Sequence, residues 1–493
     1  MTLLAHRPTG SSAPGEAAPL LAAARNPELV AGALLCVAVV WTTVFFPVGS
    51  GGREPFALTK DVVPVVLALV ALRPWRVVRP WIVASAALIA GAALVVCAVT
   101  PPGWFGANRA ASYGVAAATF VAVAAYARRS RRAYLVATLV VVAGGVQFFR
   151  ALVPWWGSRD SATAMIGTFY WHNQFGAFLL APAILGLTLA LAGRPPFRFA
   201  GWIVTPFAVA GVVFSSSRGS ALALIAGWLL IGVAVVRSKR VSSGGRARGP
   251  LIRRWLAMSL LAGAVTFGLA GPPLFSTWHA PWVGAQARAA TGQTLEQNGG
   301  VRIYLWREAL IVFEHHPVAG AGFGAMSDEA VKLTPSTWPR SPLAHNDYLQ
   351  PFAEGGLLLG LPMLFGCGAI AVFLGRRLWA LLRRGFTDPL RVGVVVAALV
   401  TMAHAGIDFD WSYPALFATS AAVAGLACGS ATAVSRHRQR SRSVASRAVA
   451  AGAVVALIST VLVGAVAGRH GGLSLVYRSH AAPDQAHSQA VSP

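Results

Sequence analysis

The chain has 493 residues, of which 56% are hydrophobic and 12% are charged, about half of the roughly 25% charged residues usual in soluble domains. One soluble core cannot bury so much apolar surface, so a soluble domain is excluded and lipid is the expected solvent. The net charge of +25 comes from short basic clusters between apolar runs. This is the pattern of membrane topology, and it excludes a nucleic-acid-binding face.

Residues 1–28 are rich in small residues and proline, and we expect a disordered cytoplasmic tail. Apolar runs long enough to span a bilayer as helices then recur along the chain. They lie at 29–46, 57–72, 80–99, 110–127, 133–152, 172–192, 199–216, 219–236, 255–272, 352–374, 392–410, 412–430 and 448–468. The sequence therefore predicts an all-α, polytopic transmembrane helical bundle with about 12–13 spans.

The basic clusters predict the orientation of the bundle. Most of the 41 basic residues lie in alternate gaps, at 73–79, 128–132, 194–198, 237–254, 376–391 and 436–447. Short loops rich in arginine and lysine stay in the cytoplasm, so we expect a cytoplasmic N-terminus. This topology gives transmembrane helices at 29–272 and 351–468, separated by one large extracytoplasmic loop at 273–350. It also places the tail at 469–493 outside.

The large loop is expected to contain a helix. Ile303, Trp306, Leu310 and Phe313 fall at helical spacing and would line one side of it. Such a helix can lie at the membrane interface or pack over the transmembrane bundle. Function is sought in this loop because every other outer gap is short.

The first polar segment on the outer side is SSSRGS at 215–220. Arg218 stands there against the positive-inside trend. One interpretation is an arginine that snorkels to a lipid headgroup. The other is an anion site formed by the Arg218 guanidinium, the Ser217 hydroxyl and the backbone at Gly219.

The second segment is NGGVRIYLWREALIVFEHHP at 298–317. Arg302 is expected in the first turn of the loop helix, after a cap at 298–300, where free N–H groups and the helix dipole favour anions. The alternative is an ordinary solvated arginine.

The third segment is AHNDYLQPFAEGGLLLG at 344–360. His345 precedes a span that is expected to begin near Pro351, with Glu354 one turn in. A histidine in a loop is usually just solvated, but topology places His345, Arg218 and Arg302 on one side of the membrane. Arginines bind phosphate oxygens bidentately, and a neutral imidazole is a suitable base near pH 7. This set suits transfer of a sugar from a lipid diphosphate.

The chain resembles the O-antigen ligase and O-antigen polymerase superfamily of bacterial membrane glycosyltransferases over roughly 165–430. The resemblance rests on SSSRG at 215–219, VRIYLWREAL and HPVAGAGFG within 301–324, and HNDYLQPFAEGG from 345. It implies a bacterial inner-membrane enzyme with an extracytoplasmic active site. Its partners would be an undecaprenyl-diphosphate-type glycan donor, a glycan or glycolipid acceptor and membrane lipids.

The resemblance also implies roles for single residues. Arg218 and Arg302 would contact the lipid diphosphate, and His345 would act as the base. Asn346 and Glu354 match the family pattern with supporting roles in substrate binding. The reaction would need no metal and no cofactor, and it would invert the anomeric carbon.

Other polar residues are less informative. His172 and Asn173 can line the site or simply cap a helix. GAGFG at 320–324 follows no βαβ strand, so we interpret it as a turn and not a nucleotide loop. Asp408 and Asp410 form an Asp-x-Asp pair, but metal-dependent membrane glycosyltransferases carry that pair in their first outer loop.

Two other classes of protein remain open. A transporter or flippase predicts inverted repeats with broken helices and ionisable residues at the midplane, for which His404 is the clear candidate. A structural scaffold of the cell envelope would not need two arginines and a histidine on one face. The sequence does not distinguish a ligase from a polymerase.

Overall fold

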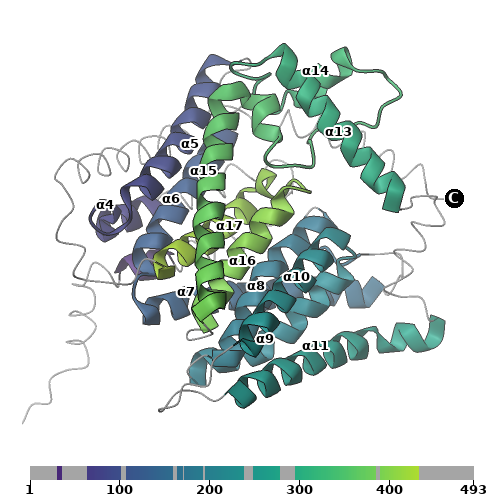
Figure 1. Cartoon of the computed structure of the whole chain (residues 1–493). Helices are drawn as coiled ribbons and strands as arrows, with labels where there is room; N and C mark the ends of the chain where they lie inside the picture. The colour runs from purple at the N-terminus through teal and green to yellow at the C-terminus, as the bar shows by residue number, and fades with distance from the viewer. Residues whose placement is uncertain are drawn as a thin grey trace, which may run out of the picture.

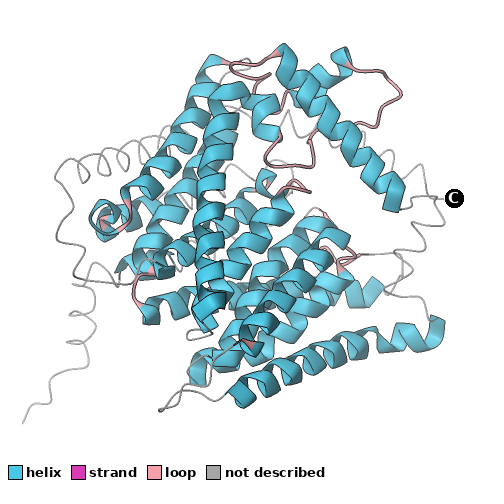
Figure 2. Ribbon diagram, in the orientation of Figure 1, coloured by secondary structure: helices cyan, strands magenta, loops and turns pink. Residues whose placement is uncertain are grey.

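The structure is a computed structural model that describes residues 30–35, 64–100, 107–158, 164–169, 171–192, 195–237, 248–277, 295–384 and 389–431. Over these residues it consists of helices joined by turns and loops, without strands (Figure 2). The main helices are α4 (Pro74–Val77), α5 (Pro80–Val99), α6 (Ala107–Tyr126), α7 (Ser130–Ser158), α8 (His172–Ala192), α9 (Pro195–Phe214), α10 (Arg218–Val236), α11 (Arg248–Thr277), α13 (Leu295–His315), α14 (Met326–Leu333), α15 (Gln350–Arg384), α16 (Pro389–Ala405) and α17 (Pro414–Ala431). A short 3-10 helix, η2 (Asp410–Ser412), lies between the last two.

Among the described helices, seven are long and apolar enough to cross a bilayer: α5, α7, α8, α9, α10, α11 and α15. The apolar helices α16 and α17 are shorter. With α6, these helices coincide with every span expected between residues 80 and 430, so the polytopic all-α fold is confirmed. The expected span at 57–72 is helical over 64–72. The one at 29–46 lies mostly, and the one at 448–468 wholly, outside the described residues.

The centre of the bundle is α8, which packs against α7, α9, α10 and α16 (Figure 1). Its whole span is buried, whereas only 17% of the α11 span is. A helix that is apolar on all sides is stable in the middle of a bundle because every side meets another helix. The exposed leucines and phenylalanine of α11, such as Leu260 and Phe267, are suited to lipid.

Proline marks where several helices begin. α5, α9, α16 and α17 each start on a proline, whose missing N–H costs nothing at a position where that N–H has no helical partner. The N-terminal end of α10 is different: it is capped by the Ser217 hydroxyl, which accepts a hydrogen bond from the Ser220 N–H at 3.3 Å.

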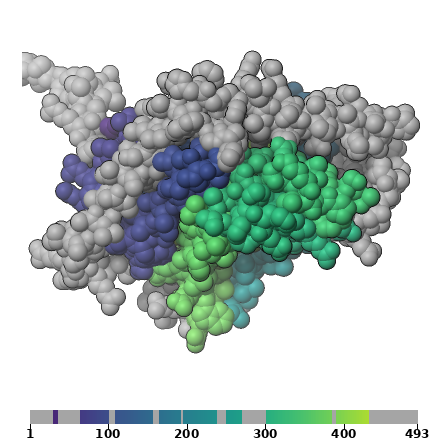
Figure 3. Space-filling view, turned by 90° about the horizontal axis from the view of Figure 1, so that it is seen from above, coloured from purple at the N-terminus to yellow at the C-terminus, as the bar shows by residue number. Residues whose placement is uncertain are grey.

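The segment between α11 and α15 gathers at one end of the bundle, which we name the loop end. It is formed by α13, α14 and the turn at 345–349 (Figure 1). Seen from above, this segment stands beside α5 and α6 (Figure 3). It is joined to the bundle through α15, which packs against α13, α14, α5 and α16.

Main-chain hydrogen bonds fasten the loop to α15. The N–H groups of Ala321 and Gly322 donate to the carbonyls of Ala353 and Glu354, each at 2.9 Å. In return the Leu357 and Leu358 N–H groups donate to the carbonyls of Pro317 and Val318, at 2.8 and 3.1 Å. The glycine-rich motif is therefore the turn that was expected, and it docks on α15.

Two glycines allow this docking. Gly356 has φ 55°, which breaks α15, and a Cβ there would collide with the Val318 carbonyl. Gly320 has φ 71°, and a Cβ there would collide with the backbone of Glu354 and Gly355. Only glycine combines this backbone conformation with so close an approach.

Candidate functional site at the loop end

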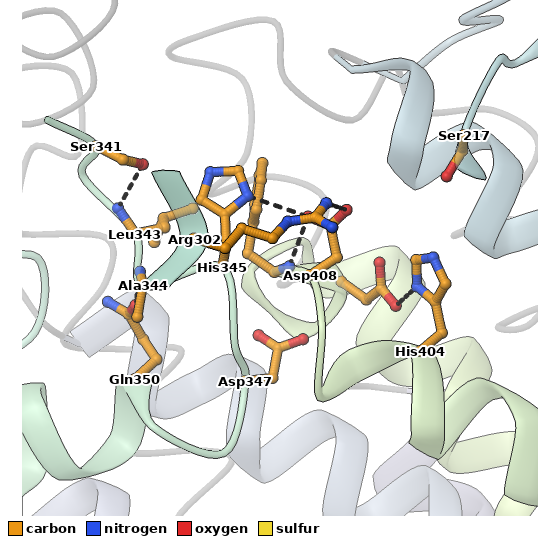
Figure 4. Close-up of polar contacts among 12 residues, drawn as sticks. Ser217, Arg302, Ser341, Leu343, Ala344, His345, Asp347, Gln350, His404 and Asp408 are labelled. Atoms are coloured by element: carbon orange, nitrogen blue, oxygen red, sulfur yellow. Dashed lines mark hydrogen bonds and ion pairs between the residues drawn. The ribbon is translucent and has the colours of Figure 1, made fainter. Parts of the chain in front are cut away.

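The carboxylate of Asp408 is the centre of the site. Its Oδ2 lies 3.3 Å from Nη2 of Arg302, and its Oδ1 lies 3.4 Å from Nδ1 of His345 (Figure 4). The Asp408 side chain is 2% exposed, while those of Arg302 and His345 are 31% and 21% exposed. A buried anion thus holds two partly exposed basic groups together.

Arg302 comes from α13, but not from its first turn as expected. α13 begins at Leu295, so Arg302 follows two turns of helix and the helix N-terminus does not reinforce it. The expectation failed because polar residues before an apolar run can also be helical.

The packed face of α13 also differs from the prediction. Leu305, Ala309 and Val312 are buried, whereas Ile303 and Leu310 are 51% and 43% exposed. The shared helical spacing was correct, but the buried stripe lies on a different side of the helix. It is set by contacts with α14 and α15 that local spacing does not contain.

His345 lies in a strained turn. Its φ is 51°, an uncommon conformation for a residue with a side chain. Trp306, one turn after Arg302 on α13, donates its indole N–H to the His345 carbonyl at 3.4 Å. The imidazole packs edge-on against Phe409, with ring centroids 4.3 Å apart. Contacts from α13 and from the segment that carries Phe409 therefore restrain the histidine.

The residues after His345 fasten this turn to the bundle. The Asn346 side-chain oxygen accepts hydrogen bonds from the N–H groups of Tyr348 and Leu349, at 2.9 and 3.1 Å. The Asp347 N–H donates to the Ala405 carbonyl at 2.9 Å, and its carboxylate accepts from the Trp411 N–H at 2.7 Å. The Asn346 side chain thus stabilises the turn that precedes α15.

Arg109 braces the same region from α6. Its guanidinium donates to the Ser412 carbonyl at 2.8 Å and to the Ser412 hydroxyl at 3.0 Å. The segment that carries Asp408 and Asp410 is thereby tied to the first half of the chain.

The expected anion site at 215–220 forms a tight turn at the start of α10. Ser216 has φ 55°, and the Ser215 hydroxyl accepts a hydrogen bond from the Ser217 N–H at 3.3 Å. Arg218 is the first residue of α10, and its Nη1 is buried without a hydrogen-bond partner. A buried guanidinium N–H with no acceptor is suited to an anionic ligand.

The start of α8 lies against this turn. Nδ1 of His172 is 2.8 Å from the Ser215 carbonyl. Gly176 is packed so closely that a Cβ there would be 2.6 Å from Oγ of Ser215 and 2.9 Å from Oγ of Ser220. His172 therefore belongs to the neighbourhood of Arg218, and Asn173 follows it as the second residue of α8.

A buried histidine links this turn to the aspartates. Nε2 of His404 is 3.0 Å from Oγ of Ser220, and Nδ1 of His404 is 2.6 Å from Oδ2 of Asp410. Gly219 lies against the same ring, since a Cβ at this position would be 3.2 Å from Nε2 of His404. His404 thus contacts both the turn that carries Arg218 and the segment that carries Asp408 and Asp410.

Glu354 has structural partners. Its side chain is buried, and Oε1 accepts hydrogen bonds from the Gly324 N–H at 3.0 Å and the Gln350 amide at 2.9 Å. These contacts fasten the glycine-rich turn to α15, while Oε2 is buried without a hydrogen-bond partner, and substrate binding by Glu354 stays a prediction.

The three buried aspartates differ in their electrostatics. Burial raises the pKa of Asp347 well above its ordinary value, with the charge of Asp410 adding to the effect. Burial also raises the pKa of Asp410, and its contact with His404 opposes the change without cancelling it. Burial acts on Asp408 as well, but the neighbouring His345, His404 and Arg302 lower its pKa below the ordinary value. Asp408 is thus the one of the three whose surroundings favour the charged carboxylate over the neutral acid.

Sequence reasoning missed Asp408, Asp410 and His404 as members of this site. It compared the Asp-x-Asp pair with a metal site and dismissed it. A better signal was available: acidic residues number only 16 in the chain, and two of them stand together at the end of an apolar run. Acids in such a place are usually paired.

The fold and the site together define a multi-pass helical membrane protein with a basic polar site at one end of its bundle. Residues 203–364 match the family model described as O-Antigen ligase, and this stretch contains Arg218, Arg302 and His345. Over this stretch the chain is therefore similar to the O-antigen ligases. No curated protein matches the chain significantly. His404, Asp408 and Asp410 lie beyond the matched residues.

Proposed function

We propose that the protein is a membrane glycosyltransferase that moves a glycan from an undecaprenyl-diphosphate-type carrier to an acceptor hydroxyl at the extracytoplasmic face. The observation that carries the proposal is the contact of Arg302 and His345 with the two oxygens of one buried carboxylate, Asp408. This arrangement supports the proposal because an arginine, which suits a phosphate, lies beside a histidine, which suits a base.

The base would be Nε2 of His345. Nδ1 of His345 lies 3.4 Å from Oδ1 of Asp408, so the carboxylate favours a proton on that nitrogen and leaves Nε2 as an acceptor. The carboxylate also stabilises the imidazolium that forms when Nε2 takes the acceptor's proton. Asp408 is thus an orienting group that does not itself react.

The reaction would be a single displacement. The acceptor oxygen forms a bond to the anomeric carbon, and the bond from that carbon to the diphosphate oxygen breaks. The hydroxyl proton passes to His345, and the electron pair leaves with the lipid diphosphate. Arg218 and Arg302 would stabilise the charge that develops on the leaving group. Attack opposite to the leaving group inverts the anomeric centre.

Asp408 and Asp410 do not favour the metal-dependent alternative. Each carboxylate faces basic side chains, Arg302 and His345 in one case and His404 in the other. A divalent ion would compete with these cations for the same oxygens.

The transporter alternative has little support in the described residues. α15 is broken at Gly356, but near the loop end, and the N–H groups of Leu357 and Leu358 bond to the docked loop. His404 stands in the last turn of α16 and is paired with Asp410. Neither feature is the open midplane site that transport requires.

A deletion strain tests the proposal. Loss of the protein should cause the lipid-diphosphate-linked glycan to accumulate while the mature surface glycan disappears. Restoring the wild-type gene should reverse both changes, whereas restoring a His345→Ala variant should reverse neither. Normal amounts of donor and surface glycan in the deletion strain would refute glycan transfer.

A further inference from the structure

Ser220, His404 and Asp410 form a buried chain of hydrogen bonds that the proposed reaction does not use. The Ser217 hydroxyl donates to the Ser220 hydroxyl at 2.9 Å. Ser220 is 3.0 Å from Nε2 of His404, and Nδ1 of His404 is 2.6 Å from Asp410. The three side chains come from the start of α10, the end of α16 and η2.

The hydrogen-bonded set Ser220, His404 and Asp410 is not a hydrolytic triad, although it has the same three residue types. Ser220 is 0% exposed and His404 is 1% exposed. Gly176 and Gly219 pack against them so closely that even a Cβ would crowd the Ser220 hydroxyl or the His404 ring. A substrate carbonyl therefore has no way to reach the Ser220 oxygen.

The two ends of this hydrogen-bond network, Ser220 and Asp410, each lie close in sequence to a residue of the proposed site. Ser220 lies two residues after Arg218, within the first turn of α10, and Ser217 caps that turn. Asp410 lies two residues after Asp408, and the Ile407 N–H donates to the His404 carbonyl at 2.9 Å. His404 thus touches both the segment that carries Arg218 and the segment that holds Arg302 and His345.

We propose that His404, with Ser220 and Asp410, is a positioning group that sets Arg218 and Arg302 at the separation needed to hold one diphosphate. The inference rests on the proposed function and adds residues that touch no substrate. Two arginines on separate helices act on one diphosphate only when their spacing is fixed, and a displacement of 1 Å can cost about 10²-fold in rate. The hydrogen bonds on the two imidazole nitrogens supply this link.

Double-mutant cycles test the proposal, because residues that act through one another are not additive. Ser220→Ala, Asp410→Asn and His404→Gln should each lower kcat/KM for the donor by about 10- to 10²-fold. In an Arg218→Ala background, Ser220→Ala and His404→Gln should cause little further loss. In an Arg302→Ala background, the same should hold for Asp410→Asn and His404→Gln.

Ser259→Ala is the matched control. Ser259 on α11 accepts a hydrogen bond from the Trp228 indole of α10 at 3.0 Å, so it also joins two helices through a hydroxyl. Its loss should change the thermal stability but not kcat/KM per folded molecule. Folded yield and melting temperature are measured for every variant, so that a loss of folded protein is not counted as a loss of rate.

The outcomes separate this inference from the proposed function. Wild-type kcat/KM in both Ser220→Ala and Asp410→Asn would overturn the inference, and so would double variants that show the product of the single losses. A fully active Arg218→Ala would overturn both the role of Arg218 and the inference. Non-additive losses in the double variants, together with an unchanged kcat/KM in Ser259→Ala, would support it.

Discussion

Asp408→Asn is the change that tests the site most directly. The substitution keeps the shape of the side chain but removes its charge. An amide has one oxygen, so it can accept from only one of Arg302 and His345, and its NH₂ group faces the other donor. Either the arginine is released or the histidine loses the acceptor that fixes its tautomer.

The expected loss follows from these two possibilities. A donor that no longer stabilises the leaving group costs about 10²–10³-fold in kcat, and a base in the wrong tautomer costs about 10⁴-fold. We therefore expect Asp408→Asn to lower kcat by about 10²- to 10⁴-fold. The assay is transfer from a lipid-diphosphate-linked glycan to acceptor by purified protein, with kcat referred to folded molecules.

Asp347→Asn is the matched control for this prediction. Asp347 is buried in the same region, but burial raises its pKa well above the ordinary value, whereas the pKa of Asp408 is lowered, so loss of the charge should matter less at Asp347. Its oxygen accepts from the Trp411 N–H at 2.7 Å, which an asparagine oxygen can also do. The rate of Asp347→Asn should stay within a few-fold of wild type. An active Asp408→Asn, or equal losses in both variants, would refute the reasoning.

The pH dependence of stability supplies a second measurement. The pKa of Asp408 is lowered in the folded protein, from about 3.9 in an unfolded chain. Its contribution to stability is therefore present above the ordinary value and is lost as the pH falls through the lowered pKa. The difference in melting temperature between wild type and Asp408→Asn should persist down to about pH 5 and shrink only below about pH 4. A difference that disappears near pH 6 would contradict the lowered pKa.

The other predictions use the same transfer assay. Arg218→Ala and Arg302→Ala should each lose about 10²–10³-fold in kcat with normal membrane insertion, and lysine should rescue only in part because it cannot grip two oxygens. Unchanged activity would make that arginine a headgroup anchor. His345→Ala should lose about 10²–10⁴-fold while still binding donor, and a near-normal rate would exclude it as the base. Turnover should persist in excess chelator, since arginines replace a metal, and loss that magnesium or manganese restores would contradict this. Gly356→Ala should lower the folded yield, because its Cβ would meet the Val318 carbonyl; normal yield and melting temperature would show that α15 tolerates the change.

The helices of the bundle could be predicted because their cause is local. Each apolar run between residues 80 and 430 must satisfy its own backbone hydrogen bonds in lipid, and a helix does so within the segment. Prolines at the starts of α5 and α16, and the serine cap of α10, mark ends that are equally local. The family motifs that contain Arg218, Arg302 and His345 could be read from the chain for the same reason.

The assembly of the site was decided by tertiary structure. Asp408 lies 106 residues from Arg302 in the chain, and the Ser220 to His404 contact spans 184 residues. No local pattern shows which of 16 acidic residues will meet these basic groups. The same holds for the buried face of α13 and for the break of α15 at Gly356, which follow from packing between distant segments. Local apolar patterning determined which segments cross the membrane, while burial of a few charges determined how they meet, because a buried charge is stable only beside its partner.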